Sequence, residues 1–338
     1  MSIIMTGGGT GGHLAIIKAV KEQLEDETLV YIGSTKGQDK QWFEDDSDFV
    51  AIYFLETRGV VNQGLLGKVK SLWMLVKAIK EAMQLIDKHQ ARVVFSVGGF
   101  SSAACSIAAK LKGIPLVIHE QNAALGSLNK LLKPYATAFI SSYLPESPIG
   151  AYPIKKEFFA KARVRQEVKS IIFLGGSQGA QAINSLALDM APALHTKGIS
   201  IIHQAGERNI DDVKEQYEKL GIDAEVFAFT TQLSEYMNRA DFAIARAGAS
   251  TLWELSANGL PTLYIPYPYA ASDHQYYNAH YFVAKDLAWM MREDNIDESE
   301  ILMLLDENIS KESQGLIESV EQNGSEKIAT LLKKLNNK

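Results

Sequence analysis

Cysteine is almost absent from this chain of 338 residues, which has Cys105 and no other. A single cysteine excludes an internal disulfide and most metal sites built on cysteine ligands. Cys105 lies in an apolar run of small residues with helical character. We therefore expect it to be a buried core residue rather than a nucleophile.

Long apolar runs and an excess of basic residues are also missing. No stretch approaches the roughly 20 consecutive apolar residues that a membrane-spanning helix needs. The first residues lack the basic and then apolar pattern of a signal peptide, so we expect a cytoplasmic protein. The formal net charge is −6, and neutralising nucleic-acid phosphates requires basic side chains. No nucleic-acid partner is expected.

The standard nucleotide-binding motifs are incomplete. In the turn at residues 6–13, Gly7, Gly9 and Gly12 match the dinucleotide pattern G-x-G-x-x-G. No lysine follows these glycines, which excludes a Walker A loop, and the next strand ends at Gly33 without the acid that a ribose site needs. The turn is therefore predicted to hold an anion or a sugar without being either standard motif.

His13 stands at the mouth of this turn. An imidazole has an ordinary pKa near neutrality, so His13 is a candidate general base. The alternative is a structural or solvated histidine near a helix start.

Strand and helix patterns alternate along the chain, and strand–glycine–helix turns recur at residues 6–13, 97–102 and 175–179. Such alternation is typical of parallel sheets with crossover helices. Prolines and a glycine cluster at residues 145–153, which indicates a linker. We predict an α/β protein of two doubly wound, Rossmann-like domains, 1–150 and 151–324. Packing of a last helix, about 325–338, back on the first domain is left open.

Residues 246–254 form the stretch around which the second half is organised. A strand is expected to turn at Gly248 into a helix whose first positions include Ser250 and Thr251. Their hydroxyls are predicted to cap the helix, and a helix N-terminus attracts anions. Glu254 follows within one helical turn. Ligands of open α/β sheets bind at this edge, beyond the carboxyl ends of the strands.

Two further segments place polar side chains after predicted strands. They are residues 119–122, with the sequence His-Glu-Gln-Asn, and residues 274–278, which include Gln275. Four polar residues directly after a buried strand favour a binding site over a plain turn.

Residues 68–86 predict an amphipathic helix, whose apolar positions recur at three-to-four spacing. The first interpretation is that these apolar positions form a stripe that packs on the core, which accounts for most of them. The apolar arc is wider than one face, however, and Trp73 lies among lysines. Such a helix also suits an anionic lipid surface, so contact through the Leu65–Ile86 region is the second interpretation.

The ordered motifs at residues 6–13, 97–101, 119–122, 175–179 and 246–279 together resemble the MurG family over nearly the whole chain. These are peripheral membrane glycosyltransferases that convert lipid I to lipid II in peptidoglycan synthesis. The resemblance implies a GT-B fold with two domains facing across a cleft. The second domain would bind UDP-N-acetylglucosamine, and the first would receive lipid I at the cytoplasmic face of the bacterial inner membrane. Transfer to the acceptor's C4 hydroxyl would invert the anomeric centre, without a metal or another cofactor.

The resemblance also assigns residues. Those matched to UDP-N-acetylglucosamine are Thr10, Gly11, Gly12, Asn122, Lys155, Ser177, Thr230, Ser250, Thr251, Glu254 and Gln275. Glu254 would bind the ribose, Gln275 the sugar hydroxyls and Ser177 the diphosphate. Lys155 stands where the family usually has arginine, so a bidentate contact with the phosphates is lost there. His13 would be the general base.

Other functions are compatible with the same frame. A UDP-sugar epimerase would need a pair of carboxylates in the cleft and no lipid contact. A nucleotide-sugar sensor or membrane scaffold would bind without catalysis, and an NAD oxidoreductase is disfavoured by the missing acid after Ile32. Release of UDP that depends on a lipid-linked acceptor separates the transferase from all of these.

Overall fold

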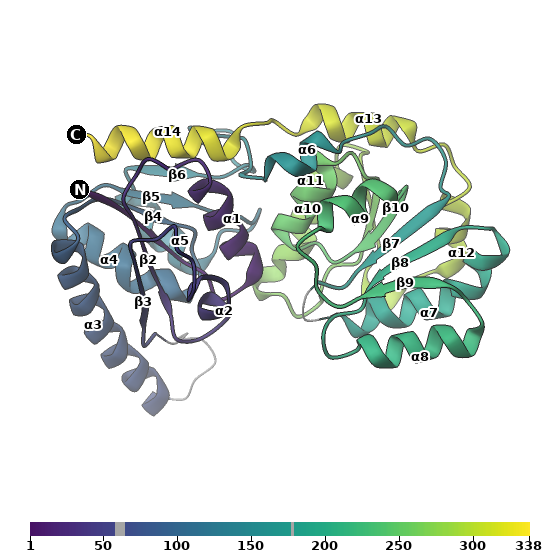
Figure 1. Cartoon of the computed structure of the whole chain (residues 1–338), viewed down its shortest axis with the longest axis horizontal. Helices are drawn as coiled ribbons and strands as arrows, with labels where there is room; N and C mark the ends of the chain where they lie inside the picture. Colours follow the sequence, from purple (N-terminus) through teal and green to yellow (C-terminus); the bar gives the residue numbers. More distant parts are fainter. Residues whose placement is uncertain (58–64, 177–178) are drawn as a thin grey trace. The chain divides into compact units, whose positions relative to one another are not determined.

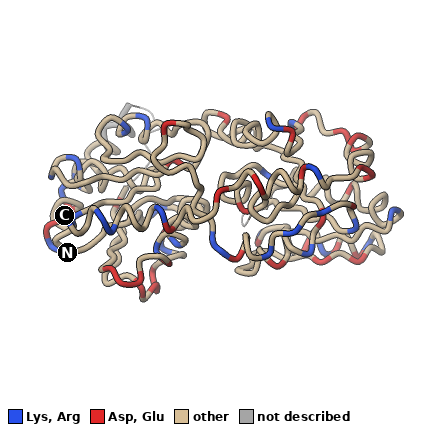
Figure 2. The backbone as a smooth tube through the Cα atoms, turned by 90° about the horizontal axis from the view of Figure 1, so that it is seen from above, with Lys and Arg blue, Asp and Glu red and all other residues tan. Residues whose placement is uncertain are grey.

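A computed structural model describes residues 1–57, 65–176 and 179–338, with the backbone alone for residues 65–70. The chain forms two compact units (Figure 1). The first unit contains Met1–Ile154 together with Gln322–Lys338, and the second contains Lys155–Glu321. Basic and acidic positions are interspersed along the described backbone (Figure 2).

The first unit is built on a parallel sheet in the order β3-β2-β1-β4-β5-β6. Its strands are β1 Ser2–Thr6, β2 Leu29–Ser34, β3 Ala51–Leu55, β4 Ala91–Ser96, β5 Leu116–His119 and β6 Ala138–Ile140. The strand order reverses between β1 and β4, where Thr6 pairs with Ser96. The glycine turns that follow these two strands therefore begin side by side, at a topological switch point.

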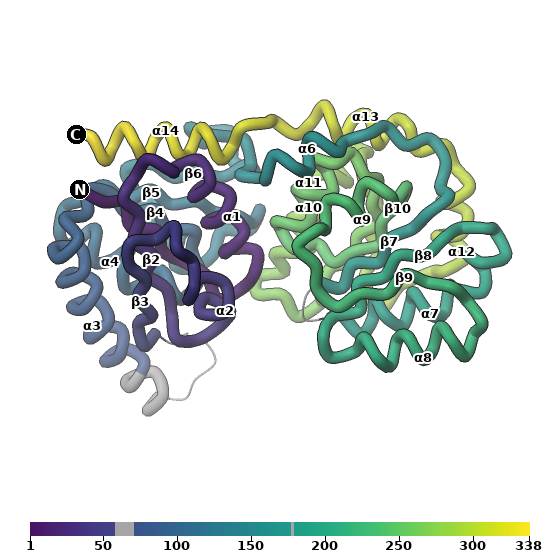
Figure 3. The backbone as a smooth tube through the Cα atoms, viewed as in Figure 1, coloured from purple at the N-terminus to yellow at the C-terminus, as the bar shows by residue number. Residues whose placement is uncertain are grey.

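Helices cover the first sheet. They are α1 Gly11–Lys21, α2 Asp39–Phe43, α3 Leu65–Lys88, α4 Ala103–Lys112, α5 Ser127–Leu132 and α14 Gly324–Asn336, with short 3₁₀ turns η1 Phe100–Ser102 and η2 Lys133–Tyr135. Helices α3 and α4 pack together, and α14 packs on α1, β1 and β4 (Figure 3). The small residues of α4 are buried against the sheet, and burial raises the pKa of the Cys105 thiol to about 12. The core prediction for Cys105 is confirmed.

The second unit repeats the design, with the order β12-β11-β10-β7-β8-β9. Its strands are β7 Ser170–Leu174, β8 Ser200–Gln204, β9 Ala224–Phe227, β10 Phe242–Ala245, β11 Thr262–Tyr264 and β12 Trp289–Met290. Its helices are α6 Lys156–Ala160, α7 Gln181–Thr196, α8 Ile210–Leu220, α9 Leu233–Arg239, α10 Ala249–Ala257, α11 His274–Val283, α12 Glu298–Leu304 and α13 Ser310–Ser319, with η3 Ala271–Asp273 and η4 Glu293–Asn295. Leu174 pairs with Ala245 at the switch point, so the turns after β7 and β10 also start together.

The predicted α/β class and doubly wound architecture are confirmed, with differences in detail. Helix α1 begins at Gly11, within the predicted glycine turn at residues 6–13. Glycine is a poor helix former, so its presence in a first turn is hard to predict. Strand β3 and helix α2 were not among the predicted elements.

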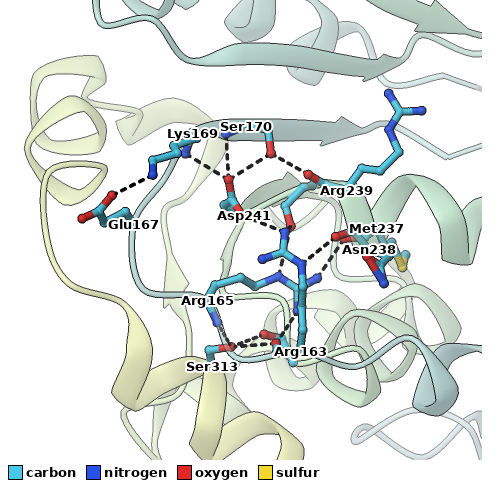
Figure 4. A network of polar contacts seen from close by, with 12 residues as sticks. Arg163, Arg165, Glu167, Lys169, Ser170, Met237, Asn238, Arg239, Asp241 and Ser313 are labelled. Atoms are coloured by element: carbon cyan, nitrogen blue, oxygen red, sulfur yellow. Dashed lines mark hydrogen bonds and ion pairs between the residues drawn. The ribbon is translucent and has the colours of Figure 1, made fainter.

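A buried arginine holds the second unit together (Figure 4). Arg165 exposes 1% of its surface, and no carboxylate is in direct contact with it among the described residues. Its guanidinium donates to oxygens at the ends of two helices and in its own loop: Ala240 O at 3.0 Å, Arg163 O at 2.8 Å, Met237 O at 2.9 Å and Asn258 Oδ1 at 2.6 Å. Burial lowers the pKa of Arg165 to about 9, which still leaves it charged at neutral pH. Arg165 thus stabilises the carbonyl-rich C-terminal ends of α9 and α10.

Replacing Arg165 with lysine is expected to lower the free energy of unfolding of the second unit by about 3 kcal/mol, because lysine cannot reach all these oxygens and leaves buried acceptors unpaired. Thermal and urea unfolding followed by tryptophan fluorescence measures the change. The exposed Arg208 supplies the control, and its change to lysine is expected to alter stability by less than about 0.5 kcal/mol. Equal effects of the two substitutions would contradict this role for Arg165.

Candidate active site

The first glycine turn, after β1, is held by a buried carboxylate. Asp39 is fully buried and accepts hydrogen bonds from Gly9 N at 2.6 Å, Ser34 N at 3.0 Å and the Tyr31 hydroxyl at 3.1 Å. A Cβ added at Gly8 would lie 2.6 Å from Asp39 Oδ1. Glycine is therefore required where the turn passes over the carboxylate.

Asp39 was missed by the sequence analysis, which looked for an acid directly after the second strand. The acid lies further along, at the start of α2, and its carboxylate faces the turn. Because the Gly9 N–H already donates to Asp39, this amide is not available to a phosphate. The only signal in the sequence is an aspartate at a helix start.

The structure brings Thr10, His13 and Gln121 together. Thr10 Oγ1 lies 2.9 Å from His13 Nδ1. Gln121 Nε2 lies 3.1 Å from His13 Nε2 and 3.2 Å from Nδ1. His13 is in the first turn of α1, and Gln121 follows β5, so the contact joins two strand ends of the sheet. Gly11 and Gly12, the other predicted residues of this turn, open the same helix.

Glu120 fixes the segment after β5. Its carboxylate is almost fully buried and accepts hydrogen bonds from Asn122 N at 3.0 Å, Gly126 N at 2.9 Å and Asn129 Nδ2 at 2.9 Å. All these bonds are internal, so Glu120 is structural. It sets the positions of its neighbours Gln121 and Asn122.

His119 precedes this segment and is fully buried against the ring of Tyr152. Neither ring nitrogen has a hydrogen-bond partner among the described residues. Burial, with a smaller contribution from the nearby His13, lowers the pKa of His119 to about 3. His119 is therefore neutral at physiological pH.

In the second unit, the turn between β10 and α10 is tightly braced. Asn278 Nδ2 donates to Ala247 O at 3.1 Å. Arg246 donates to Ile265 O at 3.0 Å and pairs with Glu293 at 2.6 Å. These contacts tie α11 and the end of β11 to the start of α10.

The N-cap of this helix is Gly248, and α10 begins at Ala249. Ser250 and Thr251 therefore lie in its first turn, as predicted. Gly248 has no side chain with which to bond the first N–H groups of the helix, and a helix N-terminus attracts anions.

Glu254 lies one turn further along α10 and is partly exposed at its surface. Burial of its carboxyl group raises the pKa to about 7, and the positive charge of Lys155 opposes that rise. Lys155 is the N-cap residue of α6, and its Nζ lies 3.8 Å from Glu157 Oε1. The structure thus brings the predicted residues Glu254 and Lys155 within electrostatic range of each other.

Gln275 lies in the first turn of α11, and Thr230 lies on a loop of the same unit. Gln275 Oε1 accepts a hydrogen bond from Tyr267 N at 2.9 Å, so its amide nitrogen is turned away from that loop. Thr230 Oγ1 accepts from Gln232 N at 2.9 Å in the loop after β9. Ser177, the remaining predicted residue, lies outside the described residues.

Residues just before Gln275 adopt an unusual backbone. Ser272 and Asp273 both have positive φ, of 53° and 50°, which is rare for residues with side chains. Arg292 donates to Asp273 through both terminal nitrogens, at 3.0 and 2.7 Å. The ion pair holds this strained entry to α11, a feature the sequence analysis missed.

Two carboxylates whose spacing could suit a metal ion form ion pairs with a lysine instead. Asp46 and Asp48 have the Asp-x-Asp spacing used by metal-dependent glycosyltransferases, but both carboxylates pair with Lys21 Nζ, at 2.7 and 2.6 Å. In the described part of the chain, no group of three or more His, Cys, Asp or Glu side chains could hold a metal ion.

Helix α3 presents a separate feature. Leu72, Trp73 and Val76 expose 59%, 67% and 46% of their surfaces, whereas Ala78 and Ala82 are buried. The apolar arc therefore serves the core on one side and faces solvent on the other. Among the described residues, every helix is too short or too polar to cross a bilayer.

Comparisons with known proteins agree with this arrangement. The glycosyltransferase family 28 N-terminal domain matches residues 3–141, and the C-terminal domain of that family matches residues 170–335. A Sulfurovum sp. (strain NBC37-1) protein is 69% identical over 98% of each chain, and it is named UDP-N-acetylglucosamine–N-acetylmuramyl-(pentapeptide) pyrophosphoryl-undecaprenol N-acetylglucosamine transferase. The chain belongs to the MurG family. The crystal structure of Acinetobacter baumannii MurG superposes with a TM-score of 0.79 at 23% identity, covering 98% of this chain and 99% of that one.

The GT-B fold predicted from the motifs is confirmed by these matches. The fold is shared with other enzymes, however. A putative UDP-N-acetylglucosamine 2-epimerase from Listeria monocytogenes superposes with a TM-score of 0.63 at 12% identity, covering 98% of this chain and 96% of that one. Architecture alone therefore does not separate a MurG-family transferase from an epimerase.

Proposed function

We propose that this chain transfers N-acetylglucosamine from UDP-N-acetylglucosamine to the C4 hydroxyl of lipid I, which is undecaprenyl-pyrophosphoryl-MurNAc-pentapeptide, to make lipid II. The observation that carries this proposal is the 69% identity, over 98% of the chain, to a transferase named for that reaction. The reaction inverts the anomeric centre and needs no cofactor.

The second unit supplies the donor site. The first turn of α10, with Ser250 and Thr251, receives the diphosphate together with Lys155 and Ser177. Glu254 accepts from the ribose hydroxyls, the loop at Thr230 meets the uracil edge, and the amide nitrogen of Gln275 donates to the sugar. As UDP departs, backbone N–H groups and Lys155 stabilise its growing negative charge.

The first unit supplies the acceptor site and the base. Its strand ends carry Thr10, Gly11, Gly12 and Asn122, which line the sugar, and His13 accepts the proton of the attacking hydroxyl. Support comes from the position of His13, which is held in the first turn of α1 by Thr10 and Gln121.

The epimerase alternative has lower support. The Listeria monocytogenes protein shares the fold of this chain, but a comparison at 12% identity supports a shared fold and nothing about activity. A non-catalytic scaffold would retain the donor site without using a base.

The decisive experiment measures UDP release with UDP-N-acetylglucosamine, with and without lipid I. Release is expected only when the acceptor is present, because an inverting transfer needs the C4 hydroxyl as nucleophile. A His13→Ala variant is expected to lower kcat by about 100-fold at saturating substrates. Formation of UDP-N-acetylmannosamine, or the absence of acceptor-dependent UDP, would contradict the proposal.

The affinity for UDP-N-acetylglucosamine is expected to fall as the pH decreases from 8 to 6. Glu254 has a pKa of about 7, so its carboxylate takes up a proton over this range and loses an acceptor for the ribose. If the ionised form alone binds well, the decrease is about tenfold. Isothermal titration calorimetry measures it, and a Glu254→Gln variant should bind weakly with little pH dependence. The same pH dependence in both proteins would exclude Glu254 as its source.

We also propose that α3 rests on an anionic membrane surface, at the cytoplasmic face of the bacterial inner membrane. Leu72, Trp73 and Val76 are the exposed apolar residues, and Lys77 and Lys80 are exposed beside them. Apolar insertion combined with basic side chains is the usual basis of such contact.

The double substitution Leu72→Glu and Trp73→Glu is expected to abolish sedimentation with phosphatidylglycerol vesicles, since it removes apolar area and adds negative charge. Transfer to a short-chain, water-soluble acceptor should persist, which shows that the protein is folded. Met303 in α12 exposes 64% of its surface and supplies the matched control, Met303→Glu, which should sediment normally. Retained sedimentation of the double variant would place the membrane contact elsewhere.

A further inference from the structure

Gln121 is a buried residue whose amide is turned toward His13. It exposes 7% of its surface, and its nitrogen lies 3.1 Å from His13 Nε2 and 3.2 Å from Nδ1. The amide nitrogen can only donate, so the ring nitrogen that it bonds must carry a lone pair. On the other side of the ring, Thr10 Oγ1 lies 2.9 Å from Nδ1 and can accept a proton from it. Together the contacts fit the imidazole tautomer with hydrogen on Nδ1.

Gln121 itself is held in place by the backbone around it. The adjacent Glu120 bonds Asn122 N and Gly126 N, which fixes the path of the chain on the C-terminal side of Gln121. Gln121 Oε1 has no hydrogen-bond partner among the described residues, so the amide is oriented by the burial of its side chain and by its contacts with His13.

The nearby carboxylates are hydrogen-bonded to other groups, and the nearby histidine is uncharged. The carboxylate of Asp39 faces Gly9 N and Ser34 N, and that of Glu120 faces its own loop. His119 from β5 is neutral, because burial lowers its pKa to about 3. None of these residues forms a hydrogen bond with the imidazole of His13 among the contacts seen in the described part of the chain.

We propose that Gln121 is a positioning residue for His13, and that with Thr10 it holds the imidazole as the Nδ1–H tautomer with the Nε2 lone pair presented as the base. The inference rests on the proposed role of His13 in transfer. In the reaction, the acceptor hydroxyl replaces the amide at Nε2 and gives it a proton. The hydroxyl oxygen forms the new bond to the anomeric carbon, and UDP leaves with the electron pair of the broken bond.

A neutral amide suits this task better than a carboxylate would. It can fix the ring without stabilising the imidazolium, so His13 stays able to accept a proton at neutral pH. A carboxylate at the same place would accept from Nε2–H, reverse the tautomer and favour the charged ring.

The test uses the full chain labelled with ¹⁵N-histidine, with the His13 signals assigned from a His13→Gln variant. Long-range ¹H–¹⁵N spectra at neutral pH are expected to show the Nδ1–H tautomer in the wild type. This measurement requires no substitution at Gln121. Observation of the Nε2–H tautomer would overturn the proposal.

Substitutions at Gln121 give the second arm. Gln121→Glu is expected to raise the pKa of His13 by about one unit or more, and the acidic limb of the kcat profile should move with it. Gln121→Leu should shift the ring toward Nε2–H and lower kcat by about tenfold or more, with KM for UDP-N-acetylglucosamine within about twofold. The exposed Gln84 on α3 provides the matched control, Gln84→Glu, which should leave the His13 signals unchanged.

An unchanged His13 pKa in Gln121→Glu would overturn the proposal, as would a raised KM with normal kcat in Gln121→Leu. If the proposed function is wrong, the experiments give a different set of results. In that case the wild type shows the expected tautomer, and Gln121→Glu shifts it, but no UDP release depends on lipid I.

Discussion

The parallel direction of the strands in each sheet is the constraint on which the candidate site depends. Parallel pairing brings the carboxyl ends of neighbouring strands to one edge, and the reversal of strand order places two turns beside each other there. In the first unit, Thr6 pairs with Ser96, and in the second, Leu174 pairs with Ala245. Each of these residues ends a strand that leads into a glycine or small-residue turn. Polar groups far apart in the sequence are thereby gathered without any special contact between them.

Buried charges give these turns their rigidity by bonding the backbone rather than a counter-charge. Asp39 accepts from the N–H groups of Gly9 and Ser34, and Glu120 accepts from those of its own loop. Arg165 does the opposite and donates to carbonyl groups at helix ends. A buried ionised group is costly unless it is fully hydrogen-bonded, so each of the three strongly favours one local conformation. The result is a fixed frame for side chains that meet substrate.

The sequence predicted the features that follow from local chemistry. Alternating buried strands and glycine turns predicted the fold, and the same pattern placed Glu254 in the helix that follows β10. Contacts made over long sequence distances could not be predicted. Asp39 acts on Gly9 from a separate helix, and Arg165 follows a linker, where a charged residue is normally solvated.

The return of α14 to the first unit has a consequence for how the protein is made. Ile328, Ala329 and Leu332 of this helix are buried, and the helix packs on β1, β4 and α1. These surfaces are synthesised before the second unit, and their cover is synthesised after it. Throughout synthesis of the second unit, the first therefore carries an uncovered apolar face, at which chaperones or premature association would act.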